Sequence, residues 1–328
     1  PIMAYQLQQR AMLPLLAKTY AYNIAFNHTK DQYTELNASN HMDVLLLCCV
    51  MKTLISWNAE ETATTCRERC GGQGFLAANR FGEGIVGGHA GITAEGDNRV
   101  LMQKVAKELL GKASKAQIAR EAVAQRLPST LRRAVEGALT GDLRDPGFVS
   151  RLLKAREHRL LAELALKLND GKKRGEGLFG VWMLEESDLV QALAQAFGER
   201  MTYACCLKAL ETCDPALRQT LSRLFNLAAM AWLERDLGWF LTEGLLSQRM
   251  GKAVSRLSRE LCHEVAPDAI ALVDAFGLPS HMQHAPIAGD WAAYNGFDNF
   301  GEVLPALQGF DHRFVHDGRP GSLANTRL

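Results

Sequence analysis

The chain has 328 residues, 47% hydrophobic and 22% charged, which is the composition of a globular protein with ample material for about two domains. Its 37 basic and 36 acidic residues give a formal net charge of +1, so no overall field favours nucleic acid or an anionic membrane. The apolar runs are far shorter than the roughly 20 residues of a membrane span, and we expect a soluble protein.

The first predicted helix covers residues 2–30, where apolar side chains recur at helical spacing. Pro14 is expected to kink it. The first residues are already strongly patterned and no cap precedes them, so we expect this helix to begin before Pro1, in a longer chain.

A second long helix is predicted for residues 39–70, with Ser39 or Asn40 as its N-cap. The glycine pair Gly71-Gly72 is its expected stop. A third helix is predicted for residues 97–111, ended by Gly111.

The remainder of the chain also has helical patterns. From residue 115 to 147 the sequence is basic and punctuated by proline and glycine, as in linker helices between domains. Four amphipathic patterns then follow, at residues 150–169, 185–213, 215–241 and 245–265. Because we find no alternating strand pattern bounded by hairpin turns, we predict an all-α protein. Its expected parts are two helical bundles, residues 1–114 and 151–328, joined by linker helices at 115–150.

The cysteines predict buried thiols rather than disulfides, because two pairs are adjacent within apolar helical stretches. Cys66 and Cys70 could share a helix face, but no histidine or cysteine cluster completes a zinc site. We expect structural cysteines, no metal and a reducing compartment. The eight are Cys48, Cys49, Cys66, Cys70, Cys205, Cys206, Cys213 and Cys262.

A glycine-rich segment, residues 82–96, lies between the second and third predicted helices. Its first six residues match the GxGxxG spacing of dinucleotide-binding turns, but that motif requires a strand before the turn and a helix after it. A helix precedes it here and no βαβ unit follows. We therefore predict a mobile loop whose backbone a ligand can approach closely.

One glutamate, Glu95, stands at the mouth of the third predicted helix. One interpretation is structural, with Asp97 or Asn98 capping the helix and Glu95 complementing its dipole. The other is functional, with Glu95 as a carboxylate base placed by a loop and Gly96 letting a substrate come close. The pattern by itself favours the structural interpretation.

Three ordered motifs change this balance: AYQLQQRAMLPLLAKTYAY (4–22), CRERCGGQGF (66–75) and TAEGDNRVLMQ (93–103). Together they resemble the acyl-CoA oxidases, relatives of the acyl-CoA dehydrogenases. The second bundle resembles the extra C-terminal helical domain of these oxidases, which simple dehydrogenases lack. The segments concerned are DLVQALAQAF, LLSQRMGKAVSRL, PDAIALVDAFGLP and YNGFDNF.

The resemblance implies an acyl-CoA substrate, with Glu95 as catalytic base and Glu95 and Gly96 at the substrate. In the family the base removes the α-proton of the thioester, whose oxygen is held by the backbone N–H of this glutamate and a flavin hydroxyl. The β-hydride passes to the flavin, which gives a trans-2-enoyl-CoA. Molecular oxygen reoxidises the flavin and yields hydrogen peroxide.

The resemblance also implies a FAD site shared between two subunits, and hence a homodimer. Gly71 and Gly72 match the glycine pair that approaches the FAD of the partner subunit, and Gln6 matches a glutamine near the same pyrophosphate. Asp97 and Asn98 follow the base where the family also contacts FAD. The chain departs from the pattern at Ala94, where the family commonly has Tyr or Phe, and this puts the acyl chain length in doubt.

The family's N-terminal helical domain and β-domain have no counterpart in this sequence, so we expect the chain to need an N-terminal half for activity. Two alternatives stay open: a non-catalytic assembly subunit with the same fold, and a dehydrogenase that passes electrons to a carrier protein.

The final Thr326-Arg327-Leu328 resembles a peroxisomal targeting signal. Five scattered histidines lack partners at ligand spacing and are expected to be structural; they are His28, His41, His89, His281 and His284.

Overall fold

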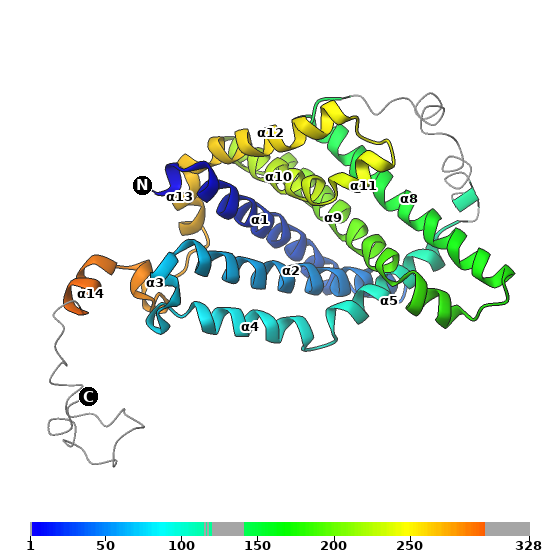
Figure 1. Cartoon of the computed structure of the whole chain (residues 1–328), viewed down its shortest axis with the longest axis horizontal. Helices are drawn as coiled ribbons and strands as arrows, with labels where there is room; N and C mark the ends of the chain where they lie inside the picture. The colour runs from blue at the N-terminus through cyan, green and yellow to red at the C-terminus, as the bar shows by residue number, and fades with distance from the viewer. Residues whose placement is uncertain (1, 115, 117, 120–140, 299–328) are drawn as a thin grey trace, which may run out of the picture.

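The computed structural model describes residues 2–114, 116, 118–119 and 141–298. The regular elements within these ranges are all helices, which confirms the all-α prediction (Figure 1). The division into domains stays a prediction, since most of residues 115–140 lies outside the described ranges. The C-terminal Thr326-Arg327-Leu328 lies outside them as well.

The first half of the described chain contains three long α-helices, two shorter α-helices and two short 3-10 helices. The long helices are confirmed close to their predicted ranges, but the expectation that the first begins before Pro1 was wrong, because α1 begins at Gln6 and Tyr5 before it has extended backbone. The elements are η1 (Ile2–Ala4), α1 (Gln6–Thr34), α2 (His41–Arg69), α3 (Gly71–Phe75), η2 (Ala77–Asn79), α4 (Phe81–Thr93) and α5 (Asn98–Lys112).

The second half begins at an aspartate-capped helix, where the Asp145 carboxylate accepts hydrogen bonds from the first backbone N–H groups and Pro146 occupies the first turn. The elements are α8 (Pro146–Lys173), η3 (Gly180–Glu185), α9 (Ser187–Thr212), α10 (Pro215–Arg235), α11 (Leu237–Thr242), α12 (Gln248–Val265), η4 (Ala266–Asp268), α13 (Ala269–Asp274), η5 (Ser280–Met282), η6 (Pro286–Ala288) and α14 (Trp291–Asp298).

Helix α1 connects the two halves. It packs against α2 on one side and against α9, α10 and α12 on the other. The buried apolar side chains of both halves accordingly form one continuous core. The largest fully buried members are Trp232, Phe148, Phe225 and Phe240.

Helix α2 is long and apolar enough that its composition alone would fit a membrane span. It packs here against α1, α4, α5 and α9, and Val50, Met51 and Leu54 are buried in the shared core. This position accounts for its apolar composition, because a helix covered on several faces is apolar around most of its surface.

Two predicted elements were wrong. The helix predicted for residues 215–241 is broken at Asp236, whose backbone turns between α10 and α11. The turn places the Asp236 carboxylate 2.8 Å from the guanidinium of Arg156, a contact that periodicity does not reveal.

The predicted glycine-rich loop is largely the helix α4. Gly84, Gly88 and Gly91 lie on the face that meets α2, and a Cβ on Gly88 would come within 3.0 Å of the Glu60 Cα. Glycine is used here for close helix packing rather than for a mobile turn. The rejection of the dinucleotide fingerprint is confirmed by this helical context.

Candidate functional site

Glu95 lies in the short connection between α4 and α5, and its side chain is exposed. Its φ of +54° is in the left-handed region, which costs a residue with a Cβ about 1 kcal/mol or more, and Gly96 follows with a φ of +98°. The chain therefore turns sharply around Glu95. Among the described residues, neither the carboxylate nor the backbone N–H of Glu95 has a hydrogen-bond partner.

The residues after Glu95 fix the start of α5. The Asp97 carboxylate accepts hydrogen bonds from the backbone N–H groups of Arg99, at 2.8 Å, and Val100, at 3.3 Å. This confirms the predicted N-cap. Asn98 is fully buried, and its amide donates to the hydroxyl of Ser56 at 2.9 Å. The Asn98 side chain and one carboxylate oxygen of Asp97 are thus engaged within the protein, and the second carboxylate oxygen of Asp97 is left for the predicted FAD contact.

A lysine from α2 reaches this loop. The ammonium of Lys52 donates to the carbonyl of Gly96 at 2.7 Å, the carbonyl of Ile92 at 3.1 Å and the side-chain oxygen of Asn98 at 2.8 Å. The lysine holds both sides of Glu95 without forming an ion pair with it. The sequence prediction missed this residue.

An open cavity of about 950 Å³ lies beside Glu95, lined by α1, α2 and α4. Its walls are mainly apolar, with Phe26 from α1, Ile55 and Ala59 from α2, and Ala94 next to Glu95. The carboxylate of Glu95 therefore stands where an apolar cavity meets solvent.

The other predicted cofactor residues lie at the far end of the same helices. Helices α1 and α2 run in opposite directions with Thr19 hydrogen-bonded to Asn58, so Gln6 is level with Gly71 and Gly72. All three are exposed, and a Cβ built on either glycine would meet no atom within 4 Å. Gly71 has a φ of +56°, the left-handed conformation expected at a helix stop. The structure thus groups Gln6 with the glycine pair and separates both from Glu95.

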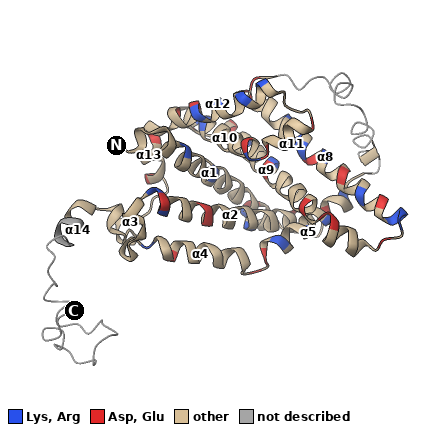
Figure 2. Ribbon diagram, viewed as in Figure 1, with Lys and Arg blue, Asp and Glu red and all other residues tan. Residues whose placement is uncertain are grey.

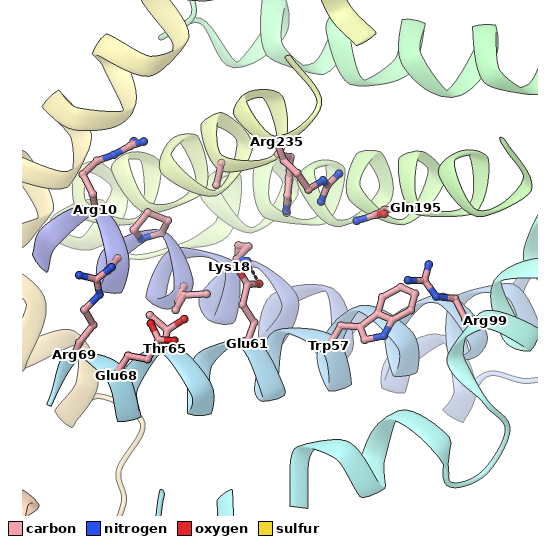
Figure 3. A pocket seen from close by; sticks show the side chains of 15 residues that line it. Arg10, Lys18, Trp57, Glu61, Thr65, Glu68, Arg69, Arg99, Gln195 and Arg235 are labelled. Atoms are coloured by element: carbon pink, nitrogen blue, oxygen red, sulfur yellow. Dashed lines mark hydrogen bonds and ion pairs between the residues drawn. The ribbon is translucent and has the colours of Figure 1, made fainter. Parts of the chain in front are cut away.

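A second cavity, of about 680 Å³, lies between α1, α2 and α10 (Figure 3). At one end the Arg99 guanidinium lies 4.8 Å from the ring centre of Trp57. Five basic side chains line the cavity: Arg10, Lys18, Arg69, Arg99 and Arg235. Three of them are paired with carboxylates, Arg10 with Glu234, Lys18 with Glu61 and Arg235 with Glu199. Arg69 and Arg99 have no carboxylate partner among the described residues, so part of the positive charge that lines the cavity is uncompensated.

A buried ion network joins α8, α9 and α10. The Glu199 carboxylate is inaccessible to solvent and lies 2.7 Å from the Arg156 guanidinium and 2.8 Å from that of Arg235. Burial alone would raise the pKa of Glu199, but Arg235 and Arg156 hold it below its ordinary value. Elsewhere among the described residues, basic and acidic side chains are intermixed along the helices (Figure 2). Glu199 and Arg156 lie in the core and away from Glu95, so we interpret the network as structural, while the more exposed Arg235 also lines the second cavity.

Comparison with known proteins agrees with this architecture. Residues 1–110 match the family model "Acyl-CoA oxidase, C-alpha1 domain", and residues 145–295 match the model "Acyl-CoA oxidase". The chain belongs to the acyl-CoA oxidase family. It is 32% identical over 313 residues to acyl-coenzyme A oxidase 2, peroxisomal, of Arabidopsis thaliana, a match that covers 90% of this chain and 45% of that protein.

A more distant relative is the human peroxisomal acyl-coenzyme A oxidase 3, with 27% identity over 88% of this chain and 44% of that protein. The chain thus spans a little under half the length of these relatives, and its fold is that of the helical C-terminal half of oxidase structures. Acyl-CoA oxidase-1 of Caenorhabditis elegans, complexed with FAD and ATP, superposes with a TM-score of 0.80 at 18% identity, over 94% of this chain and 48% of that one. Arabidopsis thaliana acyl-CoA oxidase 1 gives a TM-score of 0.76 at 24% identity, over 97% of this chain and 49% of that one.

Proposed function

We propose that this chain is the C-terminal part of a FAD-dependent acyl-CoA oxidase in which Glu95 is the catalytic base. The observation that carries the proposal is the state of Glu95. It is exposed, it has no partner among the described residues, and a strained backbone holds it at the rim of an apolar cavity. Strain of this kind gathers at functional sites. A glutamate that served only the helix dipole would not need it.

The reaction assigned to the complete oxidase is the conversion of an acyl-CoA to a trans-2-enoyl-CoA, with O₂ reduced to H₂O₂. Glu95 takes the α-proton, and its own backbone N–H is free to donate to the thioester oxygen as negative charge grows there. The carboxylate gains the proton and the substrate gains the double bond. FAD, when bound, accepts the β-hydride and passes the electrons to O₂.

The residues at the far end of α1 and α2 fit part of a FAD site. The surface around Gly71 and Gly72 is open, so a pyrophosphate could approach the backbone there, with Gln6 level with it. From Lys52, which contacts the Glu95 loop, to Arg69 at the end of α2 is 17 residues, or about 26 Å of helix. We propose that this separation reflects a homodimer, in which Glu95 acts at one active site and the glycine pair supports the cofactor of the other.

The remaining parts of the proposal are the missing half and the location. The chain spans under half of its relatives, so we propose that an N-terminal half of the oxidase, in the same or a separate chain, completes the flavin and acyl pockets. Both relatives are named peroxisomal, which supports residence in the peroxisome.

The test combines this chain with the N-terminal half and supplies O₂ as the only electron acceptor. The proposal expects bound flavin and equal amounts of enoyl-CoA and peroxide from the assembly, and neither from this chain alone. Turnover that requires a carrier protein would indicate a dehydrogenase. Full turnover by this chain alone would contradict the proposal.

A further inference from the structure

We infer that Lys52 is a positioning residue that fixes Glu95 for proton abstraction, an inference that rests on the proposed function. Its ammonium makes three hydrogen bonds, at 2.7 Å to the Gly96 carbonyl, 3.1 Å to the Ile92 carbonyl and 2.8 Å to the Asn98 side-chain oxygen. An ammonium group has three N–H donors, so all of them are used. Lys52 acts through the backbone of the loop and leaves substrate contact to Glu95.

The three acceptors lie on both sides of Glu95. Ile92 belongs to the last turn of α4, whose carbonyls have no partner within the helix, and a cation there also complements the helix dipole. Gly96 directly follows the base, and Asn98 begins α5. One side chain therefore ties the end of α4, the turn and the start of α5 to α2.

Ser56 strengthens the attachment, one helical turn after Lys52. Residues four apart lie on the same helix face, and Ser56 accepts a hydrogen bond from the Asn98 amide while Lys52 donates to the Asn98 oxygen. Asn98 is completely buried, so its amide is held at both ends in a site without solvent competition. The loop is thus fixed to the helix that five other helices pack against.

The hydrogen bonds of Lys52 hold a strained stretch of backbone in place. Glu95 and Gly96 both have positive φ values, and this backbone persists only where its surroundings enforce it. Lys52 supplies that enforcement without pairing with the Glu95 carboxylate, which stays available as a base. A displacement of about 1 Å at such a base is enough to slow catalysis by roughly a hundredfold.

The test is Lys52→Met in the complete oxidase, because methionine keeps an unbranched side chain and removes the three donors. We expect kcat to fall by about a hundredfold, while KM for acyl-CoA and flavin content change little. An α-deuterated substrate should show a larger isotope effect than with wild type, since proton abstraction becomes more rate-limiting. The control is Lys104→Met, which removes a lysine from a partly exposed pair with Glu108 and should leave kcat unchanged.

Ser56→Ala provides a milder variant if Lys52→Met folds poorly, because it removes only the outer support of Asn98. It should lower kcat severalfold with KM unchanged. Lys52→Arg should recover part of the activity, since it restores donors to the carbonyls. The inference would be overturned if kcat and the isotope effect were unchanged in Lys52→Met or Ser56→Ala. It would also be overturned if kcat fell only in proportion to the loss of bound flavin. Glu95→Gln is assayed beside them: full activity there would refute the proposed function itself, whatever Lys52→Met does.

Discussion

Two neighbouring glycines of α4 allow a matched test of how this helix is held. A Cβ on Gly87 would meet nothing within 4 Å, whereas one on Gly88 would lie 3.0 Å from the Cα and 3.2 Å from the backbone nitrogen of Glu60. The two positions are adjacent in one helix and carry the same substitution, but Gly87 is exposed whereas Gly88 lies on the face that meets α2. They therefore differ in what the added methyl group meets.

The magnitudes follow from this difference. Glycine inside a helix costs about 1 kcal/mol relative to alanine, so Gly87→Ala should stabilise the protein by about that amount. Gly88→Ala gains the same helix propensity, but its methyl group is forced against the backbone of Glu60. Overpacking of this kind costs about 1–3 kcal/mol. The free energy of unfolding should therefore be lower in Gly88→Ala than in Gly87→Ala by about 1–3 kcal/mol.

Urea unfolding measures the comparison, with the slope m required to stay the same in both variants. Because α4 ends at Thr93, two residues before Glu95, a shifted helix in Gly88→Ala should also lower kcat in the complete oxidase. Equal stabilisation by both substitutions, with unchanged activity, would refute the packing that we describe between α4 and α2.

Two further predictions concern buried groups. Glu199→Gln removes a buried carboxylate between the buried Arg156 and the more exposed Arg235, which both keep Asp236 as a partner, and should cost about 3 kcal/mol of unfolding free energy at pH 7. The pKa of Glu199 is held below its ordinary value of 4.5, so the stability that the wild type gains over Glu199→Gln is complete above pH 4.5 and shrinks as the pH falls below it. A difference in urea midpoint between the two proteins that did not narrow in acid would contradict the ion pairing. Burial raises the pKa of Cys262 to about 11, so iodoacetamide at pH 8 should modify the partly exposed Cys213 and spare Cys262. Equal labelling rates by mass spectrometry would contradict that burial.

The long helices could be predicted from sequence because their apolar residues repeat at helical spacing around a shared core. The glycine-rich segment could not be predicted in the same way, since glycine serves both mobile turns and close helix packing. The spacing of Gly84, Gly88 and Gly91 at i, i+4 and i+7 was the available signal, because such residues share one helix face. The glycine content of residues 82–96 predicted a loop, whereas this spacing favours a helix.

Some residues of the candidate site could be predicted from the sequence and others could not. The proposed role of Glu95 rests on resemblance, and the local pattern offered Asp97 or Asn98 as the N-cap, of which Asp97 is confirmed. Lys52 was not predicted, because its acceptors are two backbone carbonyls and an amide oxygen 40 to 46 residues away. The spacing of residues in the sequence does not indicate such contacts. The ion network of Glu199 was not predicted either. Its partners lie on α8 and α10, and only the structure shows that these helices meet around this single carboxylate.

The central claim is that Glu95 removes the α-proton, and anaerobic mixing of the complete oxidase with acyl-CoA tests it most directly. Loss of the flavin absorbance reports substrate oxidation before O₂ takes part. Glu95→Gln keeps the size and removes the basic charge, so FAD should remain bound while the rate of flavin reduction falls by a factor of about 100 or more. Reduction of the bound flavin at the wild-type rate in Glu95→Gln would contradict the account.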